Sequence, residues 1–418
     1  MSHNAETPAA TPAPAGFFQS LFHQPASWRV FLAIGALGTL VRVVLYVWAL
    51  AFPLINENNN QISGAIYQQD MDIGFYGRTS EVLFSYRDVS ETFQQFVDFY
   101  ISDITEPVGI IAPGPVFPAM LQLFDYRPGN TLPLSIFFVV LSTGFLWVWL
   151  RWLYGRRLSP FWLLTFALLP HPLWYMLNVS TDMPFALLVG LFFVCYFHER
   201  WSGRRIGAWL ILLTLIVLTR PNGCSFLAFC FFDMLFFQRG REGRLAILAI
   251  LAGLGAIATL FYYPYLVNEI SRTARLEQYV FFGLRTADYR EGIFGISPTW
   301  LDSAVSTFVL GWAKLLYFVG LRPSYGDAST WLVAGRALPG LILLPGLVHL
   351  YWRGDRRLKW LVSWYLLPIL LTASQDRYAL PLQPILLYQC ALLVMSVHGS
   401  LILRSKIGVR DLGDVRQE

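Results

Sequence analysis

Two neighbouring carboxylates, Asp70 and Asp72, are the residues of this chain best suited to move a proton. A carboxylate held beside a hydroxyl can act as its general base. We take Asp72 as the candidate base and Asp70 as a second carboxylate or a hydrogen-bonding partner for a substrate. Tyr76 follows closely and is a candidate wall of the same pocket. The alternative for both acids is an ordinary solvated loop carboxylate.

The run Asp70-Met71-Asp72 also matches the Asp-x-Asp pattern with which nucleotide-sugar enzymes hold a divalent metal ion. That function requires a doubly wound nucleotide-binding domain, and the segment is too short to contain one. The cysteines show no metal-ligand spacing and are expected to be small buried residues. We therefore expect neither a metal site nor another cofactor. The cysteines are Cys195, Cys224, Cys230 and Cys390.

Three arginines, Arg42, Arg220 and Arg377, stand inside or at the ends of apolar stretches. A cation at the centre of a membrane costs about 2.5–3.5 kcal/mol on insertion scales. A lipid phosphate would offset this cost, because the guanidinium fork matches phosphate oxygens. The arginines are thus candidates for binding a donor phosphate. The alternative is an ion pair, of Arg220 with Asp182 or of Arg377 with Asp376.

Three further residues are candidates for a sugar or acceptor pocket. Asp182 could bind a sugar or orient Arg220, or it could cap the helix that begins there. His171 could hydrogen-bond a donor molecule or be a packed turn histidine. Tyr378 could line the pocket or anchor the chain at a membrane interface, where tyrosine is common.

The composition indicates which elements position these residues. The chain of 418 residues is 56% hydrophobic and only 14% charged, against about 25% charged residues in soluble domains. This excludes a disordered chain, a secreted disulfide scaffold and an ordinary soluble enzyme. Apolar stretches predict an all-α polytopic bundle of about ten membrane-spanning helices. The expected spans are 30–52, 132–152, 160–177, 183–198, 206–219, 221–237, 245–267, 331–352, 358–373 and 381–403.

Basic residues gather in alternate connections between these stretches, which is the positive-inside pattern. The pattern predicts that both termini are cytoplasmic. It also accounts for the net charge of +5 without a nucleic-acid partner. The basic connections contain Arg151, Arg156 and Arg157; Arg200, Arg204 and Arg205; Arg239, Arg241 and Arg244; Arg353, Arg356, Arg357 and Lys359; and Arg404, Lys406 and Arg410.

Two long outer loops interrupt the zigzag of short connections. The first holds ten acids against three arginines. Long loops without a function are uncommon, so we expect the chemistry on the outer face. Residues 303–321 are interpreted as an amphipathic helix on the outer surface, because an eleventh span would reverse the charge pattern. The expected organisation is a disordered cytoplasmic tail (1–28), a membrane domain (29–403) with outer loops 53–131 and 268–330, and a cytoplasmic tail (404–418).

The motifs, taken in order, resemble the polyprenyl-phosphate-dependent glycosyltransferases of the GT-C membrane fold, such as the lipid A aminoarabinose transferase and protein O-mannosyltransferase-like enzymes. The family often has Glu where Asp182 and Asn222 stand, and the resemblance is weakest over residues 268–350. The matching segments are Asp72 with Tyr76, Pro113-Gly114-Pro115 with Pro118, Asp182-Met183-Pro184, Thr219-Arg220-Pro221-Asn222-Gly223, and Asp376-Arg377-Tyr378-Ala379-Leu380-Pro381-Leu382-Gln383-Pro384.

The resemblance implies a plasma-membrane enzyme with an extracytoplasmic active site. It would move a hexose or pentose, with inversion, from a polyprenyl-phosphate donor to a hydroxyl acceptor on a lipid, glycan or protein. One alternative is a transporter or flippase of a polar lipid, which would predict internal repeats and broken helices at the membrane midplane. Another is a polysaccharide polymerase or ligase, in which the largest outer loop usually comes late in the chain.

Overall fold

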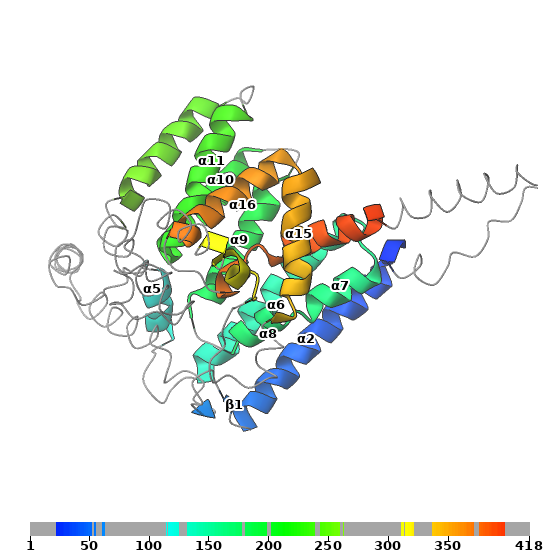
Figure 1. The fold of residues 1–418 in the computed structure, drawn as a ribbon. Helices are drawn as coiled ribbons and strands as arrows, with labels where there is room; N and C mark the ends of the chain where they lie inside the picture. Colours follow the sequence, from blue (N-terminus) through cyan, green and yellow to red (C-terminus); the bar gives the residue numbers. More distant parts are fainter. Residues whose placement is uncertain are drawn as a thin grey trace, which may run out of the picture.

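The computed structural model describes residues 22–51, 54–55, 61–62, 114, 116–124, 132–177, 180–198, 202–238, 243–259, 262, 311–312, 314–321, 337–371 and 376–397. Within these ranges regular structure is helical, apart from one antiparallel pair of two-residue strands, β1 (Leu54–Ile55) and β2 (Gln61–Ile62). The expected all-α fold is therefore confirmed for the described part of the chain (Figure 1).

Helix α9 (Asp182–Tyr196) forms the centre of the assembly. It packs against α6 (Leu132–Gly155) on one side and α10 (Gly203–Thr219) on the other. Ten of its 15 residues are buried, as expected for a helix that is apolar all round. Helix α2 (Trp28–Ala51) packs against α6 and runs along one edge of the molecule (Figure 1).

The second half of the chain adds helices on the other side of α9 and α10. Helix α11 (Cys224–Phe236) packs against α16 (Arg356–Leu371), and the short helix η1 (Pro221–Gly223) joins α10 to α11. Further helices are α5 (Val116–Leu123), α15 (Gly340–Arg353), η3 (Asp376–Ala379), Arg244–Thr259 and Gln383–Val397.

The stretch 160–177, expected as one span, is a broken helix made of α7 (Pro160–Ala167) and α8 (Pro170–Tyr175). A proline has no N–H and does not continue a helix from the preceding turn. The break removes the usual i→i−4 donor for the carbonyl of Ala167. Arg42 of α2 replaces that donor, with Nη1 3.2 Å from the Ala167 oxygen.

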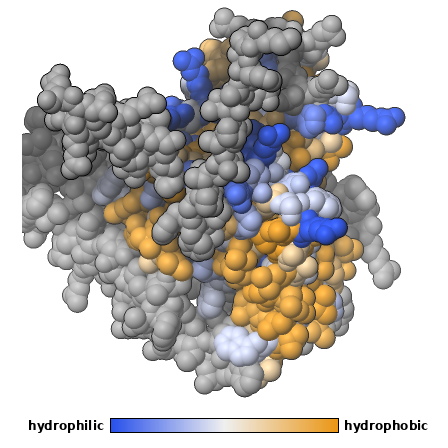
Figure 2. Space-filling model, turned by 90° about the vertical axis from the view of Figure 1, so that its right-hand side faces the viewer, coloured by the Kyte–Doolittle hydropathy of each residue, from blue (hydrophilic) through white to orange (hydrophobic). Residues whose placement is uncertain are grey.

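Among the described residues, two helices, α2 and α6, are long and apolar enough to cross a membrane, and four other apolar helices are shorter. At about 1.5 Å per residue, the 15 residues of α9 cover about 22 Å, less than the hydrocarbon thickness of about 30 Å. The number of ten crossings therefore stays a prediction. Helix α2 exposes Leu40, Val44 and Val47 by 56–57%. Figure 2 shows hydrophobic side chains gathered over a broad area of one face, with hydrophilic ones in a band above them.

The expected position of residues 303–321 on the outer membrane surface stays a prediction, because the structure describes only 311–312 and 314–321 of this segment. The short helix over 314–318 packs into the core, whereas Trp312 before it is 52% exposed. Phe318 is fully buried, and Lys314 is 2% exposed. The Lys314 ammonium donates to the carbonyl of Leu370 at 3.1 Å. Every helix leaves the carbonyls of its last turn free, and Lys314 satisfies one of these carbonyls at the C-terminus of α16.

Candidate functional site

Asp182 forms an ion cluster with two of the predicted arginines at one end of α9. Its carboxylate is 2% exposed and pairs directly with the guanidinium of Arg220. Nη1 of Arg377 lies 3.6 Å from the other carboxylate oxygen. The side chains of Arg220 and Arg377 are 11% and 20% exposed, so the arginine side of the cluster is less buried than the carboxylate.

The local fold explains how Asp182 is held. It is the first residue of α9, and the N-cap residue before it is Thr181, which makes no side-chain capping bond. The interpretation of Asp182 as the N-cap is therefore wrong, whereas the alternative of pairing with Arg220 is confirmed. The hydroxyl of Ser180 donates to the Asp182 carboxylate at 3.0 Å. An acid in the first turn also interacts favourably with the helix dipole.

Arg220 is placed by the proline that follows it. Pro221 disfavours helical geometry at the preceding residue, and Arg220 has extended angles of φ −151° and ψ 149° between α10 and η1. Its guanidinium carbon lies 5.0 Å from the centre of the Tyr378 ring. The guanidinium of Arg377 lies 5.6 Å from the same ring. Tyr378 thus contacts both cations, an arrangement worth about 0.5–1 kcal/mol per contact.

Helix η3, which carries Arg377 and Tyr378, is fixed from α16. The hydroxyl of Tyr365 donates to the carbonyl of Tyr378 at 2.9 Å. Tyr365 is 1% exposed and lies among the rings of Phe185, Phe226 and Phe318. Because a buried tyrosine has few alternative positions, this bond orients the arginine-bearing turn toward Asp182.

His171 of α8 lies beside Gln383 at the start of the helix Gln383–Val397. Its Nδ1 forms a hydrogen bond with the side-chain amide of Gln383, and the two residues are 2% and 0% exposed. The amide oxygen of Gln383 finds no partner in the part of the chain that the structure describes. Gln383 did not figure among the predicted site residues. Two sequence signals could have found it: Gln383 is a polar side chain within an apolar run, and it lies in the last of the matching segments.

Gly114, the described residue of the Pro-Gly-Pro segment, lies against the end of α10. Gly114 is buried, and a Cβ placed on it would overlap the carbonyl oxygen of Leu218. The hydroxyl of Tyr262 donates to the adjacent carbonyl of Val217 at 2.7 Å. The backbone at Gly114 therefore approaches α10 two residues before Arg220, which brings the last part of the first loop next to the cluster.

Three predicted site residues, Asp70, Asp72 and Tyr76, lie outside the described residues, so their roles stay predictions. Arg42 is fully buried and donates to Ser142 and to the carbonyls of Gly38 and Ala167. These bonds give Arg42 a structural role at the α7–α8 break, and we leave it out of the candidate site.

The cluster is electrostatically suited to bind an anion. Two guanidinium groups and one carboxylate leave one net positive charge, and the carboxylate is the most buried of the three. Within the described ranges there is no group of three or more His, Cys, Asp or Glu that could hold a metal ion. The outward-facing arginines could instead bind the oxygens of a phosphate or carboxylate group.

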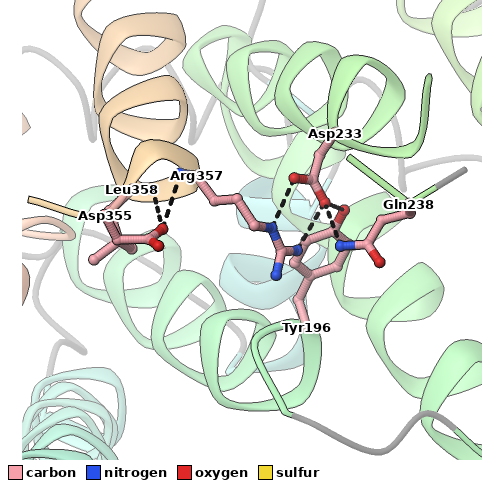
Figure 3. Close-up of polar contacts among 6 residues, drawn as sticks. All are labelled: Tyr196, Asp233, Gln238, Asp355, Arg357 and Leu358. Atoms are coloured by element: carbon pink, nitrogen blue, oxygen red, sulfur yellow. Dashed lines mark hydrogen bonds and ion pairs between the residues drawn. The ribbon is translucent and has the colours of Figure 1, made fainter. Parts of the chain in front are cut away.

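A second ion cluster lies at the opposite end of α9 (Figure 3). Asp233 of α11 accepts two hydrogen bonds from Arg357 of α16, at 2.8 and 2.7 Å, and one from Tyr196 at 2.7 Å. Burial by itself lowers the pKa of Arg357, but the hydrogen bonds and charge of Asp233 outweigh it and raise that pKa. Asp233 is 2% exposed and its hydrogen bonds join the three helices α9, α11 and α16.

No protein-family model, curated protein or solved structure matches this chain. The candidate site therefore stands on its own geometry and on the order of the sequence motifs.

Proposed function

We propose that this chain is a membrane glycosyltransferase that moves a sugar, with inversion, from a polyprenyl-phosphate donor to a hydroxyl acceptor. The observation that carries the proposal is the pairing of Arg220 and Arg377 around one buried carboxylate. These arginines come from two segments that resemble the GT-C family. An arginine pair with a partly exposed side suits a phosphate that must bind and later leave.

The position of the cluster supports an extracytoplasmic site. The other end of α9 lies at the Asp233–Arg357 cluster, next to the basic connections that the charge pattern assigns to the cytoplasm. The Asp182 cluster is thus at the end of the bundle that receives the acidic first loop. In the proposed arrangement ten helical units cross the plasma membrane, and the shorter ones are surrounded by their neighbours.

The proposed reaction is a single displacement at the sugar carbon C1. The acceptor oxygen forms a bond to C1 as the bond from C1 to the phosphate oxygen breaks, and Asp72 takes the proton of the acceptor hydroxyl. The leaving polyprenyl phosphate gains negative charge, so Arg220 and Arg377 stabilise the transition state more than the ground state. One displacement inverts the configuration at C1 and needs no glycosyl-enzyme.

Transfer of label from a polyprenyl-phosphate sugar tests the proposal directly. Membranes that contain the protein should transfer label to an endogenous acceptor without added nucleotide sugar, and a chelator should have little effect. The Arg377→Lys variant keeps the charge but loses the bidentate fork, so donor affinity and rate should both fall. A requirement for nucleotide sugar with Mn²⁺ would reject the proposal in favour of the Asp-x-Asp interpretation.

A further inference from the structure

A pocket of about 760 Å³ lies between α6 and α9, away from the Asp182 cluster. Its walls are apolar and largely aromatic, with Trp152, Leu191, Phe193 and Phe197 among them. Its volume lies within the range of about 300–1,000 Å³ that is common for small-molecule sites. The pocket lies at the end of α6 that leads into the basic connection Arg151–Arg157.

Arg151 and Arg156 bring positive charge to this apolar pocket. The guanidinium of Arg156 lies 5.2 Å from the centre of the Trp152 ring, and that of Arg151 lies 5.8 Å from the Tyr154 ring. Neither guanidinium has an acidic partner among the described residues, and the pocket lining contains no Asp or Glu. The aromatic contacts orient the guanidinium groups and leave their N–H groups available to an anion.

His198 adds a further polar group to the pocket. It lies at the end of α9, and its Nδ1 is in hydrogen-bond contact with Arg205. Arg205 belongs to the next basic connection along the chain. The pocket thus combines an apolar interior with two cations of one basic connection, and its histidine contacts a cation of the next. The charge pattern places both connections on the cytoplasmic side.

We infer that this pocket binds an anionic phospholipid of the inner leaflet, with its acyl chain against the aromatic wall and its phosphate against Arg151 and Arg156. The inference rests on the membrane placement in the proposed function, but not on the transfer reaction. A basic pocket between membrane helices on the cytoplasmic side suits an anionic lipid headgroup. The apolar wall and the volume favour a lipid over a free phosphate ion, which would fill only a small part of the pocket.

Lipid retention by the purified full-length protein tests this inference. Native mass spectrometry in detergent would measure binding of phosphatidylglycerol, with phosphatidylcholine as the zwitterionic comparison. In the double variant Arg151→Gln/Arg156→Gln, affinity for phosphatidylglycerol should fall by about 30-fold, as expected if each lost cation contributes about 1 kcal/mol. Arg353→Gln is the matched control, because Arg353 also stacks on a tryptophan, Trp352, at 4.5 Å but does not line the pocket.

Three results would overturn the inference: equal retention by the double variant, equal binding of phosphatidylcholine, or displacement of the lipid by millimolar inorganic phosphate. Unchanged thermal unfolding of the double variant in lipid-free detergent would show that any loss of binding is not a loss of fold. Label transfer measured on the same preparations separates the two proposals. A wild-type protein that transfers label but shows no preference for phosphatidylglycerol rejects the pocket alone, whereas selective lipid binding without any transfer rejects the enzyme alone.

Discussion

Asp182 at the start of α9 and Arg220 at the end of α10 form an ion pair between residues 38 positions apart, with Asp182 only 2% exposed. A buried carboxylate is costly unless cations and hydrogen bonds compensate it. Arg220, Arg377 and Ser180 together provide that compensation. The same contacts fix the two guanidinium groups at one place, so a structural pair also prepares a site for an anion.

Neutralising Asp182 should lower the stability of the fold. It should also make the stabilisation by a bound anion larger than in the wild type. Asp182→Asn leaves Arg220 and Arg377 without their counter-ion, and we expect a loss of about 1–3 kcal/mol of unfolding free energy. Added polyprenyl phosphate should raise the melting temperature of this variant more than that of the wild type. Asp355→Asn is the control, since Asp355 is exposed and accepts bonds only from the backbone N–H groups of Arg357 and Leu358. Equal shifts in both variants would contradict a phosphate site at Asp182.

Removing the proposed base should abolish turnover while leaving the donor bound. Asp72→Asn keeps the shape of the side chain and removes its basicity, so the rate should fall by about 10²–10⁴. Asp70→Asn, measured in the same membranes at matched protein levels, is the control. An inactive Asp70→Asn with a normal Asp72→Asn would assign the base to Asp70. Normal turnover in both would show that the first loop does not supply the base.

The Asp233–Arg357 cluster should matter for stability and not for catalysis. Asp233→Asn removes the charge to which Arg357 donates two hydrogen bonds, and we expect a loss of about 3 kcal/mol. Tyr196→Phe removes one hydrogen bond and should cost about 1 kcal/mol. Thermal unfolding in detergent measures both effects. The rate of transfer per folded molecule should stay at the wild-type value, and a selective loss of rate would assign this cluster a direct role.

A side chain at Gly114 should separate the first loop from α10. In Gly114→Ala the new methyl group would overlap the Leu218 carbonyl, and such overpacking costs about 1–3 kcal/mol. Gly207→Ala is the matched control, because Gly207 lies within α10 with open space around its Cα and alanine favours helix by about 1 kcal/mol. We expect opposite shifts in melting temperature. A Gly114→Ala variant as stable as Gly207→Ala would mean that this contact does not hold the loop.

Cysteine labelling tests the orientation of the bundle. Leu123 is 81% exposed at the end of α5, on the side assigned to the exterior, and Ser202 lies in a connection assigned to the cytoplasm. An impermeant thiol reagent added to intact cells should label Leu123→Cys but not Ser202→Cys above the wild-type background. After membrane disruption both should react. The reverse pattern in intact cells would invert the topology and place the Asp182 cluster in the cytoplasm.

The sequence by itself determined the helical elements of this protein. Apolar runs, prolines and basic connections are local signals, and the observed helices α2, α6, α9 and α10 lie within a few residues of their expected bounds. The candidate arginines and Asp182 also followed from the sequence, because a charge inside or beside an apolar run is unusual wherever the helices lie. The sequence also left open the pairing of Asp182 with Arg220, as the alternative to phosphate binding.

Only the tertiary structure decided which distant residues meet. Arg377 reaches Asp182, Gln383 reaches His171, and Lys314 reaches the end of α16. Asp233 pairs with Arg357, 124 positions away along the chain. The physical reason is that helical periodicity defines the faces of one helix but not which helix packs against them. A buried charge then pairs with the cation that packing brings within reach, whatever its distance along the chain.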